Sequence, residues 1–518
     1  MAGGLLLIIL STLIFIIALK LIATISKFNK NTTTTTNLPP GPTFISIIGN
    51  LLLLRKNLLH IKPMLRHLRA KYGPILSLPL TSHPSILISD RTLIHEALIQ
   101  KGAVFADRPP GLMTSNQLRI SYAPYGPLWG HLRRNLFSEI LHPCRIKLFS
   151  STRRRSLHIL FHDLQSQSSR SSAGTVVPID SFLYSMFCLA SFMCFGEDVD
   201  EKIIREIESV QRNFLVSIYN AAFYGLFPRI SNLFFRNQPN AKLVAISRRH
   251  EEILIPLIRA RRVLRNQTSV AHDHAYVDSL FELQLPEDND DEKEKRGNRK
   301  LIEDEIVSLC SEFITASTET TATSLQWIMA NLVIHQEIQA KLFDEIQGVV
   351  GSEAEEVKEE ELQRMPYLKA VVLEGLRRHP PGHFLLPHIV TKDVLLNGYL
   401  IPKGSEVNFT VADIGTADDI WDKPMEFIPE RFMEGGEGEG LDLTGKCETK
   451  MMPFGIGRRI CPGSGLGLLH LEYFVANLIK KFEWKNVDGE KINLSEKMEF
   501  TMAMEKPLHA RISTRMEV

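Results

Sequence analysis

One short segment combines residue types that could hold a metal centre. Residues 453–463 read PFGIGRRICPG, which places a single cysteine, Cys461, among glycines. Glycine lets the backbone turn tightly and come close to a flat ligand. An apolar helix is expected at 466–479, and the partial positive charge at its N-terminus favours a thiolate nearby. The pattern therefore predicts a reactive thiolate at Cys461; the alternative is a buried structural cysteine.

The same segment resembles the FxxGxRxCxG signature of the cytochrome P-450 superfamily, at Phe454, Gly457, Arg459, Cys461 and Gly463. The resemblance implies haem b (iron protoporphyrin IX), with Cys461 as the protein ligand of the iron. As is known of these enzymes, a thiolate ligand pushes electron density onto haem iron and favours cleavage of the O–O bond.

A second match concerns the propionates of the expected haem. Trp129 and Arg133 fit the family's WxxxR pattern and stand about one helical turn apart. The resemblance implies that they reach one haem propionate, with Arg459 and His388 as further candidates, since an arginine can bind a carboxylate in a forked pair. His388 matches the family less specifically. For His383 we expect an ordinary loop histidine rather than a metal ligand.

Residues 316–321 read ASTETT and resemble the oxygen-site motif of the family. The resemblance implies catalytic roles for Glu319 and Thr320: a hydroxyl that holds a water and a carboxylate that relays protons from solvent. Ser317 stands where the family usually has glycine, and its hydroxyl could bond back to a carbonyl of the preceding turn. The alternative is an amphipathic helix with ordinary Thr and Glu residues.

A charged pair further supports the resemblance. Glu374 and Arg377 are three residues apart, which puts them on one face of a helix. Arg431 resembles the family's third member of this group. We expect the three to form a buried structural network.

Apolar residues at spacings of three and four predict a mostly helical chain. Short strands are expected at 75–80 and 85–89, as a hairpin. Strands at 394–396, 399–401 and 406–411 are expected to form another small sheet, with Asn397-Gly398 as its turn. The predicted fold is mainly α with small β-sheets: a single large domain of the cytochrome P-450 kind plus an N-terminal transmembrane helix. The predicted helices are 63–72, 128–140, 202–221, 241–266, 301–334 and 336–350.

Composition excludes several classes of protein. The 518 residues are 44% hydrophobic, enough for a large core. Net charge is +1, with 60 basic and 59 acidic side chains, whereas domains that bind nucleic acid usually carry a basic excess. The six cysteines are irregularly spaced without a CxxC pair, so a zinc site or a disulfide framework is not expected.

The N-terminus predicts a membrane anchor. Lys20 is the only charged residue between positions 3 and 25, and about 20 apolar residues span a bilayer. Positive charge follows this stretch, which favours a cytosolic body; the alternative is a cleaved signal peptide. We expect an anchor at 1–26, a linker and proline-rich hinge at 27–42, and a catalytic domain at 43–518. No second apolar stretch of that length is expected. The resemblance to microsomal and plant members implies a single-pass protein of the endoplasmic reticulum membrane, in contact with lipid.

The implied reaction is monooxygenation, in which one oxygen atom of O2 enters a small lipophilic substrate. Electrons would come from NADPH through a separate NADPH–cytochrome P-450 reductase, for which Arg458 is a weak docking candidate. By resemblance, 107–122, 213–237, 308–317, 382–386 and 500–504 face the substrate, although their apolar residues could equally be core. Two alternatives remain: an isomerase or dehydratase on the same fold, and a non-enzymatic haem protein.

Overall fold

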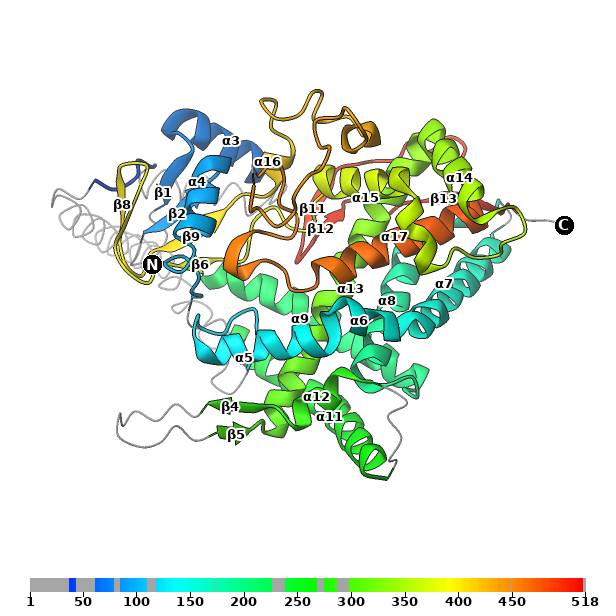
Figure 1. Cartoon of the computed structure of the whole chain (residues 1–518), viewed down its shortest axis with the longest axis horizontal. Helices are drawn as coiled ribbons and strands as arrows, with labels where there is room; N and C mark the ends of the chain where they lie inside the picture. Colours follow the sequence, from blue (N-terminus) through cyan, green and yellow to red (C-terminus); the bar gives the residue numbers. More distant parts are fainter. Residues whose placement is uncertain are drawn as a thin grey trace, which may run out of the picture.

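Long helices make up most of the molecule and small sheets lie beside them, as a computed structural model shows (Figure 1). The structure describes residues 37–42, 61–78, 84–109, 118–171, 173–225, 238–267, 274–286, 298–447 and 449–515. The predicted class, mainly helical with small sheets in one large domain, is confirmed. The α-helices described are α3 Ile61–Tyr72, α4 Arg91–His95, α5 Pro127–Leu136, α6 Pro143–Ile146, α7 Ser150–Arg170, α8 Pro178–Phe195, α9 Glu201–Gly225, α11 Gln238–Gln267, α12 Tyr276–Phe281, α13 Glu303–Ile334, α14 Gln336–Val350, α15 Pro366–Arg378, α16 Ala412–Gly415 and α17 Ser464–Lys481.

Helix α13 is the axis of the core. It is 32 residues long, most of its side chains are buried, and α8, α11, α15 and α17 pack against it. Acidic residues fill its first turn, Glu303 to Glu305, where they interact favourably with the helix dipole. Neighbours cover α13 on most sides, so even polar residues of this helix are buried, among them Ser308, Thr315 and Gln326.

Helix α8 corrects one expectation, since it is a second stretch apolar enough to cross a membrane by length and composition. Of the 18 residues of this helix, 89% are buried inside the protein, so α8 is a core helix. Ser181, Ser185 and Ser191 interrupt its apolar sequence but are themselves buried. The predicted anchor, 1–26, lies outside the described residues.

Most predicted helices agree with the structure to within a few residues. The ranges 63–72, 202–221, 241–266, 301–334 and 336–350 correspond to α3, α9, α11, α13 and α14. The predicted helix 128–140 is α-helical only to Leu136 and continues as a π-helical turn, Phe137–Leu141. The helix expected at 466–479 is α17.

The main sheet joins strands from distant parts of the chain in the order β1 Ile75–Leu78, β2 Ser85–Ile88, β9 Glu406–Phe409 and β6 His388–Ile389. The predicted hairpin is confirmed, because β1 and β2 pair antiparallel. Strand β9 was expected beside 394–401 but pairs parallel with β2 instead. A parallel pair needs a long crossover, so local sequence carries no sign of it.

The other sheets are small. The hairpin of β7 Val394–Leu396 and β8 Tyr399–Ile401 turns at Asn397 and Gly398, both with positive φ, as predicted. The remaining sheets are β10 Phe482–Asn486 with β13 Ala510–Thr514 and β3 Thr175–Val176, β11 Glu496–Met498 with β12 Met502–Met504, and β4 Gln284–Pro286 with β5 Asn298–Lys300.

The end of the predicted hinge is attached to the domain. The amide of Leu400 donates to the carbonyl of Asn37 (2.8 Å), and the amide of Ser77 donates to the carbonyl of Pro40 (2.9 Å). A Cβ on Gly41 would lie 1.8 Å from the Ser77 carbonyl oxygen, so only glycine allows this close approach. Residues 37–42 therefore lie against the β1 and β8 strands.

Candidate functional site

The cysteine loop, residues 453–463, is a tight turn that leads into α17. The amide of Cys461 donates to the carbonyl of Phe454 (2.9 Å) and closes the loop. Gly457 has a φ of +76°, in the region that favours glycine. A Cβ there would lie 2.2 Å from the carbonyl oxygen of Leu98, so the missing side chain lets the loop press against the π-helix Glu96–Gln100.

The thiol of Cys461 is solvent-accessible although protein surrounds the loop. Burial by the nearby chain raises the pKa of this thiol. Two groups act in the opposite direction and lower it: the backbone N–H of Gly463, which donates to the sulfur, and the positive charge of Arg133. The loop therefore supplies what a metal-bound thiolate needs, an accessible sulfur with an N–H donor and a cation beside it.

Trp129 and Arg133 lie together on α5 and reach the loop, as the WxxxR spacing suggested. The guanidinium of Arg133 lies 5.5 Å from the centre of the Trp129 ring, and its Nη2 donates to the carbonyl of Ile460. Ile460 is the only hydrogen-bond acceptor of Arg133 among the residues described. Donors on this guanidinium thus remain for a carboxylate.

Arg459 behaves differently. Its guanidinium donates to three backbone carbonyls, those of Ala106 (2.7 Å), Ile120 (3.3 Å) and Ala123 (2.7 Å). It also stacks over Trp129, 4.6 Å from the ring centre. Burial, partly offset by Asp107, lowers the pKa of Arg459 to about 10. The structure thus shows Arg459 joining the cysteine loop to the segment before α5.

His388 is buried in β6, with Nδ1 against the carbonyl of Phe105. Burial and the positive charges of Arg108 and Arg459 lower its pKa to about 3, so the ring is neutral at physiological pH. Arg108 itself donates to the carbonyls of Ser121, Leu386 and Pro387. Sequence reasoning missed this arginine, because its acceptors come from distant segments.

The middle of α13 carries an accessible face that we call the α13 face: Glu312, Ala316 and Thr320. These residues are four apart and share one side of the helix. Ala316 is exposed although most residues around it on α13 are buried. The hydroxyl of Thr320 donates to the carbonyl of Ala316 (2.8 Å). An exposed alanine in a core helix indicates that this face borders open space within the domain.

Ser317 and Glu319 flank that face. The hydroxyl of Ser317 donates to the carbonyl of Phe313 (2.8 Å), which confirms the predicted bond to the preceding turn. The α-helix continues through this residue without a bulge. Glu319 Oε2 is buried and has no hydrogen-bond partner among the described residues. Burial raises the pKa of Glu319, against the attraction of Arg212.

Glu312 ties the α13 face to the segment before α5. Its carboxylate accepts hydrogen bonds from the amides of Ile120 (2.6 Å) and Ser121 (2.8 Å) and from the Ser121 hydroxyl. Because Ile120 also accepts from Arg459, this short segment spans from α13 to the cysteine loop. Sequence reasoning did not identify Glu312, since no motif contains it.

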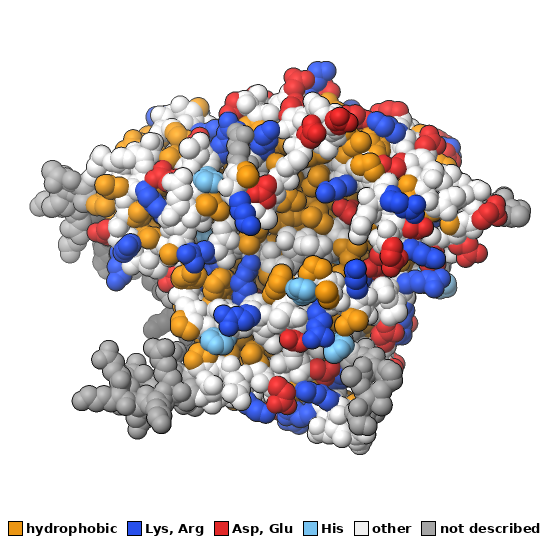
Figure 2. Space-filling view, viewed as in Figure 1, with side chains coloured by type: hydrophobic (Ala, Val, Ile, Leu, Met, Phe, Trp, Pro, Cys, Tyr) orange, Lys and Arg blue, Asp and Glu red, His pale blue; other side chains and the backbone are white. Residues whose placement is uncertain are grey.

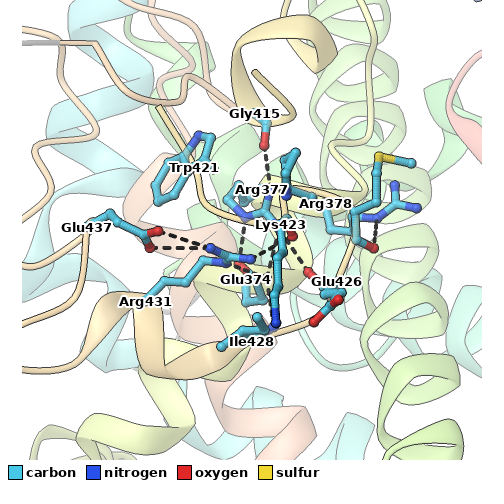
Figure 3. A network of polar contacts seen from close by, with 12 residues as sticks. Glu374, Arg377, Arg378, Gly415, Trp421, Lys423, Glu426, Ile428, Arg431 and Glu437 are labelled. Atoms are coloured by element: carbon cyan, nitrogen blue, oxygen red, sulfur yellow. Dashed lines mark hydrogen bonds and ion pairs between the residues drawn. The ribbon is translucent and has the colours of Figure 1, made fainter. Parts of the chain in front are cut away.

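The predicted charge network is confirmed in full (Figure 3). Arg377 donates to both oxygens of Glu374 (2.6 and 2.8 Å), and Arg431 Nε lies 3.5 Å from the same carboxylate. All three side chains are buried. Arg377 also donates to the carbonyls of Gly415, Pro424 and Glu426, which fixes the chain after α16 on the end of α15. We call this set the Arg377 network.

One large groove lies away from these residues. It has a volume of about 1550 Å³ between α7, α8, the start of α9 and residues 354–360. Its lining is rich in charged groups, among them Arg154, Arg155 and His158. It contains neither Cys461 nor any residue of the α13 face, so it is not the site predicted from sequence.

The residues present fit a haem. The accessible thiol of Cys461 offers a soft ligand for iron, and Arg133 offers donors for a carboxylate beside it. The exposed Ala316 marks space next to α13. Figure 2 shows a hollow near the middle of this face of the molecule, with hydrophobic side chains lining it.

Comparisons with known proteins agree with this geometry. A family model described as cytochrome P-450 matches residues 39–511. Cytochrome P-450 89A9 of Arabidopsis thaliana is 45% identical, over 98% of this chain and 98% of that protein. A flavonoid 3′-monooxygenase of Arabidopsis thaliana is 29% identical, over 98% and 96%. A zebra fish cytochrome P-450 structure with progesterone has a TM-score of 0.70 at 22% identity, covering 86% of this chain and 97% of that one, which supports the fold. The chain therefore belongs to the cytochrome P-450 family, as a plant-type haem monooxygenase.

Proposed function

We propose that Cys461 ligates the iron of haem b. The observation that supports this assignment most directly is the accessible thiol of Cys461 beside Arg133. Trp129 and Arg133 hold a propionate. His388, whose ring is neutral, and Arg459 act mainly by fixing the segments around the haem, because their polar atoms already bond to backbone carbonyls. Phe454, Gly457 and Gly463 shape the loop.

When bound, the haem supplies dioxygen activation, which a thiolate ligand promotes by donating electron density. The protein supplies protons. Glu319 Oε2 holds a proton readily because burial raises its pKa, and it exchanges that proton with solvent. The Thr320 hydroxyl, now bonded to Ala316, can turn to hold a water at the α13 face.

The substrate is a small lipophilic molecule. Phe313 of α13 and Met502 of β12 are apolar residues in the segments expected to face it, and both are almost fully buried. The exposed Ala316, three residues after Phe313 on α13, leaves room at this helix. Electrons come from NADPH through a separate NADPH–cytochrome P-450 reductase. The exposed Arg458 in the cysteine loop suits an acidic partner.

Residues 1–26 anchor the protein in the endoplasmic reticulum membrane by a single helix, with 27–42 as hinge and 43–518 as a cytosolic catalytic domain. The apolar stretch, in which Lys20 is the only charged residue between positions 3 and 25, supports the anchor, and the basic residues after it support the orientation. The attachment of 37–42 to β1 and β8 holds the domain close to its anchor.

Carbon monoxide binding to the reduced protein tests the ligand assignment. A strongly red-shifted Soret band is expected for wild type, and Cys461→Ala abolishes it. Cys447→Ala, at an exposed cysteine outside the loop, is the matched control and keeps the band. Absence of the band in wild type would refute thiolate ligation.

Turnover with NADPH and the reductase tests the reaction. We expect oxygen from O2 in the product and, for Thr320→Ala, an intact band but at least tenfold more hydrogen peroxide per product. Ser324→Ala, one turn further along α13, is the control because its hydroxyl also bonds back to its own helix. A red-shifted band without oxygen insertion into any lipophilic compound would favour the isomerase alternative.

A further inference from the structure

Arg119, just before α5, is a buried arginine without a hydrogen-bond or ion-pair partner among the described residues. Its side chain is 6% exposed. Nε has no hydrogen-bond acceptor, and no ion pair joins its guanidinium to any residue within the described ranges. The guanidinium lies over the ring of Phe214 in α9, with its carbon 4.5 Å from the ring centre. An aromatic face attracts the charge but does not replace acceptors for five N–H donors.

The neighbouring ionisable groups do not supply the missing acceptor. Glu312 attracts Arg119 electrostatically, but its oxygens already accept from Ile120 and Ser121. Tyr122 does not supply a negative charge either, because burial raises the pKa of its hydroxyl and the side chain stays neutral.

His250 of α11 also contacts Phe214, in a T-shaped arrangement with ring centres 5.4 Å apart. It is 4% exposed, and its Nε2 also has no hydrogen-bond partner among the residues described. Burial and the charge of Arg119 lower the pKa of His250 to about 3, so it is neutral at physiological pH. Of Arg119, Phe214 and His250, only Arg119 therefore carries a positive charge.

Arg119 lies at one end of the candidate active site. The next residue, Ile120, donates to Glu312 on the α13 face and accepts from Arg459 of the cysteine loop. Phe214, beneath Arg119, belongs to a segment expected to face the substrate. The unpartnered cation thus lies between the cysteine loop, α9 and α13.

We propose that Arg119 binds a carboxylate carried by an otherwise lipophilic substrate. This inference rests on the proposed monooxygenase function and narrows its substrate class. Two N–H donors on one edge of a guanidinium match the two oxygens of a carboxylate, and a water-poor surrounding strengthens such a pair. Glu312, which attracts Arg119, and Thr320 are two steps of four residues apart on α13. A helix rises about 1.5 Å per residue, so a substrate that reaches from one of these residues to the other spans roughly 12 Å.

Ligand titration of the full-length haem protein, followed by the shift of its Soret band, tests the proposal with dodecanoic acid and its methyl ester. Wild type is expected to bind the acid at least tenfold more tightly than the ester. Arg119→Met keeps the length of the side chain and removes its charge. Its affinity for the acid is expected to fall at least tenfold, and its affinity for the ester to change less than twofold. Arg119→Lys keeps the charge without the fork and is intermediate. The control Arg248→Met, at an exposed arginine of α11, leaves both affinities unchanged.

Thermal unfolding separates ligand binding from a structural role. Because its charge is buried without a partner, Arg119→Met should unfold at the wild-type temperature or above it. A lower unfolding temperature together with an unchanged preference for the acid would overturn the proposal. The proposal would also be overturned if wild type bound the acid and the ester with equal affinity while its carbon monoxide band and its reductase-driven oxidation were intact. Loss of that band in wild type would instead refute the proposed function itself.

Discussion

The surroundings of Arg377 and of Arg119 show two ways of burying the same side chain. Arg377 is 1% exposed and donates to both oxygens of Glu374 and to three backbone carbonyls. Arg119 is 6% exposed and reaches no acceptor among the residues described. A buried charge whose partners all come from the chain stabilises one arrangement of that chain. A buried charge without such partners can still bind an oppositely charged ligand.

The same contrast separates the cysteine loop from the middle of α13. Arg459 donates hydrogen bonds to the carbonyls of Ala106, Ile120 and Ala123, and these bonds fix the loop in place. On α13, the hydroxyls of Ser317 and Thr320 donate, among the described residues, only to carbonyls of their own helix. We infer that the loop and the Arg377 network are set by folding, while the α13 region keeps polar groups for protons and ligand.

The largest effect is expected from Glu374→Gln in the Arg377 network. Removing this carboxylate charge leaves Arg377 and Arg431 buried without it, and such a loss costs about 3–5 kcal/mol of folding free energy. Denaturant unfolding and haem content of the purified protein measure the outcome, and both should fall sharply.

Glu252→Gln is the matched control, since Glu252 pairs with Arg249 and both side chains are exposed, at 61% and 51%. Surface pairs contribute about 0–1 kcal/mol, so this variant should behave almost as wild type. Similar losses in both variants would mean that the complete set of partners around Arg377 has no special importance.

Gly457→Ala tests whether the cysteine loop is as rigid as its contacts indicate. A φ of +76° costs a residue with a side chain about 1–2 kcal/mol. The Cβ would also lie 2.2 Å from the Leu98 carbonyl oxygen, so the loop must shift. We expect a lower unfolding temperature and a smaller fraction of protein with the red-shifted carbon monoxide band.

Gly465→Ala, eight residues later in α17, serves as the comparison. A Cβ there meets no atom within 4 Å, and alanine favours helix by up to about 1 kcal/mol. This variant should equal or exceed wild type in stability. If both variants kept full haem content, the loop would be more adaptable than its geometry suggests.

The sequence predicted best those features whose partners are close in the chain. Glu374 and Arg377 are one helical turn apart, and Asn397-Gly398 forms its turn alone, so both appear in a local pattern. The pairing of β2 with β9 was missed because it joins Ser85 to Glu406. Helix α7 was missed because buried polar residues, Arg153 and Ser156 among them, obscure its apolar period.

The site divides in the same way. From the sequence, its motifs could be assigned to a loop and two helices. The partners that determine the role of each side chain could not be predicted. The motif that contains Arg459 carries no sign of the three distant carbonyls to which its guanidinium donates. Nothing near Arg119 in the sequence marks it, because its isolation arises from α9, α11 and α13 packing around it.

The smallest effect is expected from Glu319→Gln, on the α13 side of the contrast. Burial raises the pKa of Glu319, so the folded state holds this proton more tightly than the unfolded state does. Wild type should therefore lose stability relative to the variant as pH rises from the ordinary value of 4.5 through the raised value. Below 4.5 both states bind the proton, and the two proteins should show their smallest difference.

The expected change is smaller than the ~1–3 kcal/mol that a fully buried unpaired polar group costs, because Glu319 is only partly buried. Unfolding temperatures measured from pH 4 to 8 check it, with exposed Glu505→Gln as control. If the difference between wild type and Glu319→Gln had the opposite sign, a cation would have to pair with Glu319. The α13 region would then resemble the Arg377 network, and the contrast between the two regions would fail.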